Sequence, residues 1–160
     1  MDTTRVSFGE MLAGAGGLVV FVCMFLPWFD GSLAGRGVSK VEVDTITGWE
    51  AFGSFFDLVI IVLAAVPIAI VVWRASAPPS GLPAEPSTLV LGAGALLLAV
   101  LLWRVLDPPD LFDVPLPDLE TDISRNPAAF AAPLAALVVM VGGWAQGRER
   151  ALAERRRAQP

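Results

Sequence analysis

Four long apolar stretches are the feature that most limits how this 160-residue chain can fold. They cover about residues 8–29, 51–73, 88–106 and 128–146. Each is close to the roughly 20 residues that an α-helix needs to cross about 30 Å of hydrocarbon. The run 59–72 has no polar side chain on any face, whereas a helix on a soluble protein keeps one polar face. Because backbone amides in lipid must bond internally, we expect four membrane-spanning helices.

The basic residues predict the orientation of these spans. Four crossings leave both termini on one side, together with the loop between the second and third spans. This side holds most of the basic residues, namely Arg5, Arg74, Arg148, Arg150, Arg155, Arg156 and Arg157. The opposite side holds Arg36, Lys40, Arg104 and Arg125. The positive-inside rule therefore predicts that both termini are cytoplasmic, and we expect the chain in the plasma (inner) membrane.

These spans predict the fold class. We expect an all-α, integral membrane, antiparallel four-helix bundle with two outer loops. Residues 1–147 would form the membrane domain, and residues 148–160 a basic cytoplasmic tail on anionic headgroups. The alternative of a cleaved first stretch rests on the small residues before Gly35, but its apolar run is longer than the usual 7–15 residues of a signal peptide. The sequence leaves open whether residues 1–34 are removed.

Tryptophans test the span boundaries independently. All five fall near predicted ends, with Trp28, Trp49 and Trp103 on the outer side and Trp73 and Trp144 on the inner side. Indole rings prefer the headgroup region, so we interpret all five as interfacial anchors.

The outer loops differ in composition. Residues 31–48 alternate apolar and polar side chains, which predicts a short hairpin or strand pair. Residues 107–127 contain five prolines among acidic residues, which predicts an extended, non-helical segment. We expect this segment to cross the bundle through Leu111, Phe112, Val114 and Leu116.

Small residues recur on the predicted helices, where they allow neighbouring helices to approach closely. They are Gly9, Ala13 and Gly17 in the first span, Gly92 and Gly94 in the third, and Ala128, Ala132, Ala136, Gly142 and Gly143 in the fourth. The pattern fits seams within one bundle or an oligomer face, and the sequence does not separate the two.

Local signals mark two helices. Ser7 and Glu10 match the S-x-x-E capping box, which predicts that Ser7 begins the first helix and that Glu10 acts as its cap. Pro67 lies inside the second span, where it removes a helical hydrogen bond and predicts a kink.

Asp57 is an acid inside the predicted membrane region, where a charge costs about 2.5–3.5 kcal/mol without a partner. Arg104 closes the third span on the same side. We hypothesise an Asp57–Arg104 ion pair within an outer structural cluster that also holds Trp28 and Trp49. The alternative is that Asp57 bonds Ser54 or water while Arg104 extends to the interface.

Composition excludes several chemistries. The chain has no histidine, one cysteine and a formal charge of −5. It therefore lacks the ligands of His- and Cys-based zinc sites, the imidazole of a catalytic triad, the second cysteine of a disulfide and the positive charge that binds nucleic acid. We predict no catalytic residue, no cofactor and no metal.

We therefore predict a non-enzymatic membrane component, structural or an accessory partner in assembly, whose contacts are the lipid bilayer and other membrane proteins or a second copy. The alternative is a small-solute or ion transporter or channel subunit that uses Asp57 and Pro67. The sequence contains no relay of ionisable groups across the core, which counts against the alternative.

Four motifs in order carry a resemblance. They are Phe25-Leu26-Pro27-Trp28-Phe29, Gly48-Trp49-Glu50-Ala51-Phe52 followed by Asp57, Arg104-Val105-Leu106-Asp107-Pro108-Pro109, and Gly142-Gly143. In this order and spacing the chain resembles a group of small, uncharacterised bacterial four-helix membrane proteins. The resemblance implies the four-helix architecture and carries no assigned activity.

Overall fold

A computed structural model describes residues 6–35, 38–76, 85–109 and 119–158 of the protein. The elements are α1 (Phe8–Cys23), β1 (Pro27–Gly35), β2 (Val38–Thr47), α2 (Gly48–Ala51), α3 (Ser54–Ser76), α4 (Pro86–Leu106), β3 (Leu119–Arg125) and α5 (Pro127–Ala158). The protein is mostly helical, but its three strands form a sheet. The prediction of an all-α fold is wrong in this respect.

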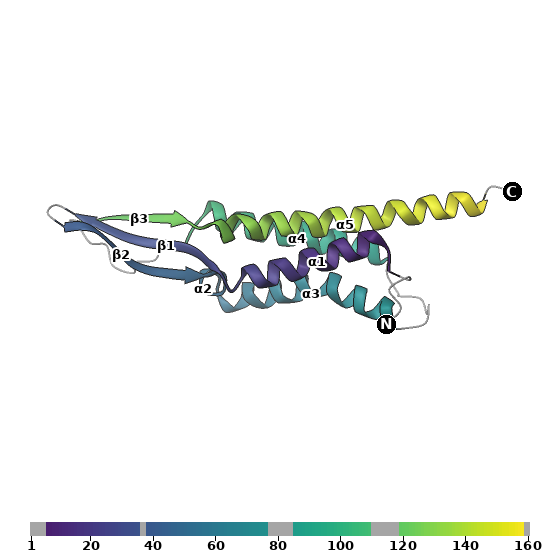
Figure 1. Ribbon diagram of the computed structural model, residues 1–160, viewed down its shortest axis with the longest axis horizontal. Helices are drawn as coiled ribbons and strands as arrows, with labels where there is room; N and C mark the ends of the chain where they lie inside the picture. The colour runs from purple at the N-terminus through teal and green to yellow at the C-terminus, as the bar shows by residue number, and fades with distance from the viewer. Residues whose placement is uncertain (1–5, 36–37, 77–84, 110–118, 159–160) are drawn as a thin grey trace.

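The four long helices lie side by side, and the sheet extends from one end of them (Figure 1). Helix α1 packs against α3 and α5, and α4 packs against the same two helices. The start of α1 and the end of α5 lie at the end of the bundle opposite the sheet (Figure 1). The residues predicted as a separate tail from 148 onward continue α5 without a break as far as Ala158.

Helices α3, α4 and α5 are each long and apolar enough to cross a membrane. Their bounds agree with the predicted second, third and fourth spans to within a few residues at most ends. Helix α1 is also apolar, but its 16 residues extend only about 24 Å. The predicted first span, 8–29, is therefore too long, because the helix ends at Cys23.

Pro27 and Trp28 explain why α1 stops early. The residue before a proline is disfavoured in the helical region, so the chain leaves the helix ahead of Pro27 and enters β1. The indole Nε1 of Trp28 then donates a hydrogen bond of 2.8 Å to the carbonyl of Cys23 at the helix end, which also accepts from the amide of Leu26 at 3.2 Å. Trp28 is fully buried, so it is a core residue and the interfacial role predicted for it is wrong.

The sheet has the strand order β2–β1–β3, and both pairings are antiparallel. The β1–β2 pair is the hairpin expected in the first outer loop, although β1 begins at Pro27, inside the predicted first span. Strand β3 lies in the second outer loop, and its residues are extended as predicted. It pairs with β1 so that Gly31 lies opposite Ile123. Leu111, Phe112, Val114 and Leu116 lie outside the described residues.

A short helix separates the sheet from α3. The hydroxyl of Thr47 accepts from the amide of Glu50, and the Glu50 carboxylate accepts from the amide and hydroxyl of Thr47, which forms a second capping box at the start of α2. These hydrogen bonds, the backbone bond first, lower the pKa of the exposed Glu50 carboxyl. The chain is extended at Phe52, and α3 begins only at Ser54.

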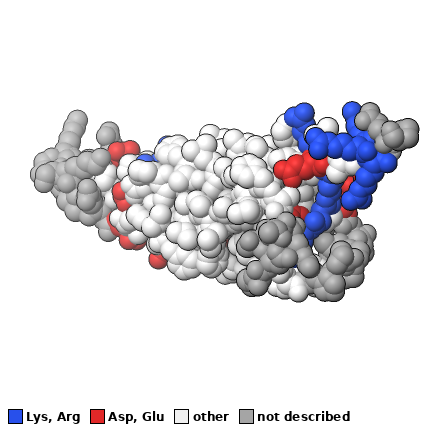
Figure 2. All heavy atoms as spheres, turned by 45° about the vertical axis from the view of Figure 1, so that its right-hand side comes forward, with Lys and Arg blue, Asp and Glu red and all other residues white. Residues whose placement is uncertain are grey.

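Glycine and alanine are frequent in the interior of the bundle, beside larger residues such as Leu97 and Leu101, and many other large apolar side chains face outward. The buried small residues include Ala13, Gly16, Gly17, Ala64, Ala93, Gly94, Ala132, Ala136, Gly142 and Gly143. The exposed large ones include Leu18, Val22, Phe55, Leu58, Val62, Leu96, Leu134 and Val141. Figure 2 shows the result on one face, an uncharged middle region between a mainly acidic end at the sheet and a mainly basic end at the finish of α5.

Two adjacent glycines on α5 bring different helices into backbone contact. A Cβ added at Gly142 would lie 2.7 Å from the amide nitrogen of Ala13 in α1, and one added at Gly143 would lie 2.7 Å from the amide nitrogen of Leu91 in α4. On α4, Gly94 meets α5 in the same way, at 2.7 Å from the amide nitrogen of Met140, whereas Gly92 faces open space. The predicted seams are therefore present on α1, α4 and α5, with Gly92 outside them.

We predict that Gly142→Ala and Gly143→Ala each lower the free energy of unfolding by about 1–3 kcal/mol, because the new methyl group would overlap a neighbouring backbone that cannot move as a side chain can. Gly92→Ala is the matched control, and it should be neutral or slightly stabilising because nothing lies within 4 Å of its Cβ. Thermal unfolding in detergent measures all three variants. Equal stability of the three would contradict the close packing.

Candidate functional site

Glu10 is the most deeply buried charged side chain in the described part of the chain, with 2% of its surface exposed. It lies in the first turn of α1, at the end of the bundle that also holds the end of α3 and the middle of α5 (Figure 1). A buried carboxylate is costly unless it is paired and hydrogen-bonded. Its surroundings therefore form the candidate site.

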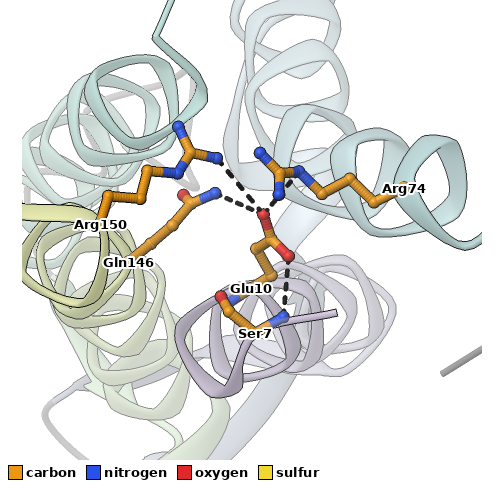
Figure 3. Close-up of polar contacts among 5 residues, drawn as sticks. All are labelled: Ser7, Glu10, Arg74, Gln146 and Arg150. Carbon is orange, nitrogen blue, oxygen red and sulfur yellow. Dashed lines mark hydrogen bonds and ion pairs between the residues drawn. The ribbon is translucent and has the colours of Figure 1, made fainter. Parts of the chain in front are cut away.

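The two oxygens of Glu10 have different partners (Figure 3). Oε2 accepts a 2.9 Å hydrogen bond from the amide of Ser7, and the Ser7 hydroxyl accepts from the amide of Glu10 at 3.2 Å. The predicted capping box is therefore present. Oε1 accepts from Nε2 of Gln146 at 2.6 Å and pairs with Nε of Arg74 at 2.8 Å, while Nη2 of Arg150 lies 3.7 Å away.

Three helices supply this arrangement, which we call the Glu10 centre (Ser7, Glu10, Arg74, Gln146 and Arg150). Arg74 is in the last turn of α3, and Gln146 and Arg150 lie one turn apart on the same face of α5. Gly142, one turn before Gln146 on that face, lets α1 approach α5 closely enough for the Gln146 amide to reach the carboxylate. The centre thus joins α1, α3 and α5 at the basic end.

The charges of the Glu10 centre do not cancel. One carboxylate faces two guanidinium groups, whose side chains keep 34% and 27% of their surface exposed. Arg74 makes the short contact, whereas the longer contact of Arg150 leaves its Nη2 without a hydrogen-bond partner among the described residues. Without the carboxylate, two like charges would face each other at the helix ends.

The sequence predicts Glu10 as a helix cap and does not predict its contacts with Arg74, Gln146 and Arg150. Arg74 and Gln146 lie at the inner ends of their predicted spans, at the same depth as Glu10, and this shared depth was the available signal. It was not sufficient, because many residues share that depth and the rotation of each helix decides which of them face inward. Chemically, the centre joins the helices through charge-assisted hydrogen bonds to one carboxylate.

The predicted outer cluster is only partly brought together. The guanidinium of Arg104 donates to the carbonyls of Ala51 and Asp107, and it lies 5.8 Å from the ring centre of Phe52. The Phe52 ring in turn packs edge-on against Trp28, with ring centres 5.7 Å apart. Phe52, to which the sequence assigned no role in the cluster, therefore links Trp28 to Arg104.

Trp49 and Asp57 are placed differently. Trp49 packs against Phe21 and Phe25, with ring centres 6.0 and 5.4 Å apart, on the α1 side. The structure shows no ion pair between Asp57 and Arg104, both of which are described, and the buried Oδ1 of Asp57 has no hydrogen-bond partner among the described residues. The hypothesised pair is therefore not seen. The helix break before α3 leaves the Ala51 carbonyl within reach of Arg104, which donates there instead.

Pro67 is buried at the contact between α3 and α1. A Cβ added at Gly17 would lie 2.7 Å from the carbonyl oxygen of Ala64 and 3.0 Å from Cγ of Pro67. The proline ring thus forms part of the close-packed surface on which α1 rests. Cys23, the single cysteine, is buried with a free thiol.

Two residues that the sequence did not single out attach the sheet to the bundle. Nε of Arg125 donates to the carbonyl of Val105 in α4 at 2.8 Å. Nδ2 of Asn126 donates to Oδ2 of Asp30 at 2.9 Å, and its amide donates to the carbonyl of Trp28 at 2.8 Å. These bonds fix the end of β3 against both α4 and β1.

Within the described ranges, no group of three or more His, Cys, Asp and Glu side chains is arranged to hold a metal ion. No protein-family model matches the chain, and no curated protein matches it.

We predict that Glu10→Gln lowers the free energy of unfolding far more than Glu50→Gln does. Glu10 and Glu50 both close capping boxes, and glutamine can keep that bond in each case. Only Glu10 is buried beside two arginines, and breaking a buried ion pair costs about 3–5 kcal/mol. Thermal unfolding in detergent compares the two variants. Equal losses in the free energy of unfolding would show that Glu10 acts only as a helix cap.

A double-mutant cycle tests the specific pair. Arg74→Gln should destabilise the protein more than Arg150→Gln, because Arg74 makes the shorter contact with Oε1. Glu10→Gln combined with Arg74→Gln should cost less than the sum of the two single changes, since the partners are removed together. Strict additivity of the free energies of unfolding would show that the two side chains do not interact.

Proposed function

We propose that this protein is a non-enzymatic integral membrane protein of the bacterial plasma membrane, which crosses the bilayer four times and serves as a structural or accessory partner for another membrane or envelope protein. The observation that carries the proposal is the surface of the bundle, where many large apolar side chains are exposed around close helix contacts made by glycine and alanine. Water would penalise such a surface, whereas lipid solvates it without cost.

The short helix α1 is compatible with a fourth crossing. Its outward face carries Leu18 and Val22, while its inner face packs against α3 and α5 along the bundle. A helix of about 24 Å is somewhat shorter than the hydrocarbon region, a mismatch that bilayers accommodate by local thinning. Because α1 is held by two neighbours, it does not depend on lipid contact alone.

Charge supports cytoplasmic termini. The end of the bundle that holds the Glu10 centre also carries Arg148 and the arginines at the end of α5, whereas the sheet end displays acidic groups (Figure 2). The positive-inside rule favours the basic end on the cytoplasmic side. The sheet then projects from the outer surface.

The projecting sheet supports a role in contacting a partner. It extends beyond the ends of the helices, and β2 and β3 form its two edges in the described part of the chain (Figure 1). A free edge offers backbone groups that a strand of another protein can pair with. Hydrogen bonds from Arg125 and Asn126 hold the end of β3 against α4 and β1, so the sheet has a fixed position on the bundle.

The packing favours this role over transport. Pro67 lies in the close contact between α1 and α3, and α5 touches α1 and α4 through backbone atoms at Gly142 and Gly143. A transport route would need a polar passage between these helices, and backbone contact leaves little space for one.

Cysteine labelling tests the proposed topology. The native Cys23 is buried and should react little, so single cysteines at exposed positions report their side of the membrane. We expect a membrane-impermeant maleimide to label Ser124→Cys in intact cells, and Ala151→Cys only after permeabilisation. Labelling in the opposite order would invert the topology, and recovery of the chain in a detergent-free supernatant would refute membrane insertion.

Site-specific photo-crosslinking tests the accessory role. A photoreactive residue in place of the exposed Thr45 on β2 should capture a discrete polypeptide in intact membranes. The matched control replaces Leu134, whose side chain is 63% exposed on α5 and should contact lipid alone. Identical products at both positions, or none at Thr45, would contradict a partner on the sheet.

A further inference from the structure

A pocket of about 300 Å³ lies between the first turn of α4 and the facing turns of α5, at the basic end of the bundle. It is separate from the Glu10 centre, which lies between α1, α3 and α5. Its lining includes Ser87 and Thr88 from α4 and Gly143, Trp144, Gly147 and Arg148 from α5.

Missing side chains on α5 create the pocket. Gly143 and Gly147 are one turn apart on the face of α5 that meets α4. At Gly143 the two backbones touch, but a Cβ added at Gly147 would lie 3.7 Å from Cβ of Ser87, an ordinary contact distance. The helices therefore diverge between these glycines and leave space at the end of the bundle.

The pocket has polar groups suited to an anion. Ser87 is 93% buried, yet its hydroxyl makes no hydrogen bond to a described residue. It belongs to the first turn of the 21-residue helix α4, whose N-cap residue Glu85 makes no side-chain capping bond. The start of a helix carries partial positive charge, which favours a phosphate group.

Arg148 adds a full positive charge at the edge of the pocket. Its guanidinium carbon lies 4.8 Å from the ring centre of Trp144, a cation–π contact that restrains the side chain. Trp144 is 54% exposed and stands where the apolar part of α5 ends, the depth that tryptophan prefers at a membrane interface. From Arg148 onward, α5 holds five arginines against two glutamates, so this end of the bundle remains net positive when the Glu85 carboxylate at the start of α4 is added.

Toward the middle of the bundle, the exposed side chains beyond the pocket are apolar. Leu91 lines the pocket, and Leu96 of α4 and Val141 of α5 are exposed further along the same two helices. A ligand that fits has a phosphate at one end and a hydrocarbon chain at the other.

We propose that this pocket is a binding site for an anionic phospholipid of the cytoplasmic leaflet. Its phosphate binds Arg148, the Ser87 hydroxyl and the start of α4, and an acyl chain lies along Leu91 and the outer faces of α4 and α5. The site rests on the membrane location proposed above. One bound lipid would then bridge α4 and α5 where the backbones separate.

Native mass spectrometry of the full chain tests the site, with phosphatidylglycerol and phosphatidylcholine added in turn to the detergent-purified protein. We expect the wild-type protein to retain one phosphatidylglycerol in preference to phosphatidylcholine. Arg148→Gln removes the charge, and Gly147→Leu fills the pocket. Each should weaken phosphatidylglycerol binding by about ten-fold or more.

Matched variants control for charge and bulk. Arg156→Gln removes an equal charge from the exposed end of α5, and Gly53→Leu adds an equal side chain at an exposed position before α3, at the other end of the bundle, so both should bind phosphatidylglycerol like the wild type. Equal loss in Arg148→Gln and Arg156→Gln, no preference for phosphatidylglycerol, or displacement of the lipid by equimolar inorganic phosphate would overturn the proposal. If Gly147→Leu does not fold, Arg148→Gln decides alone.

The two proposals fail separately. A chain that inserts into membranes but binds both lipids equally would refute the lipid site and leave the proposed function standing. A chain recovered from the detergent-free supernatant would refute the proposed function first.

Discussion

Direct contact between helix backbones is the interaction on which the rest of the structure depends. Gly142 and Gly143 bring α1 and α4 against consecutive residues of α5, and Gly17 brings α1 against α3. Because glycine and alanine take up much of the interior, only some of the large apolar side chains, such as Leu97 and Leu101, are buried, and many others lie on the outer surface. Such a bundle gains little from the hydrophobic effect in water and is suited to lipid, where packing itself drives association. The proposed location therefore follows from the packing and not only from hydropathy.

The two ends of the bundle are stabilised in different ways. At the basic end, the carboxylate of Glu10 collects donors from α3 and α5, so one buried charge ties three helices together. At the other end, the carbonyl of Cys23 accepts from the Trp28 indole, and Arg125 and Asn126 anchor the sheet to the helices. Polar bonds are concentrated where the helices end, because the helix termini leave backbone groups without partners there. The middle of the bundle relies on close packing.

Local patterns in the sequence predicted much of the helical structure. Hydrophobic length identified α3, α4 and α5, the Ser7–Glu10 motif identified the start of α1, and residue alternation identified the β1–β2 hairpin. The end of α1 was missed because Pro27 and Trp28 lie within a continuous apolar run, and hydropathy does not distinguish a helix from a buried strand. For the site, the cap of Glu10 was predictable from adjacent residues, but its contact with Gln146 joins positions far apart in the chain.

The sequence by itself determined where the four long helices lie along the chain and which end of the bundle is basic, since these properties depend on residues close together in the chain. Only the tertiary structure decided that Glu10 faces Arg74 and Gln146, that Arg104 bonds the Ala51 carbonyl in place of Asp57, and that β3 completes a sheet with β1. The physical reason is that each of these contacts depends on the rotation and depth of whole helices. A rotation by one residue would turn a buried side chain outward without changing the local pattern that makes the helix.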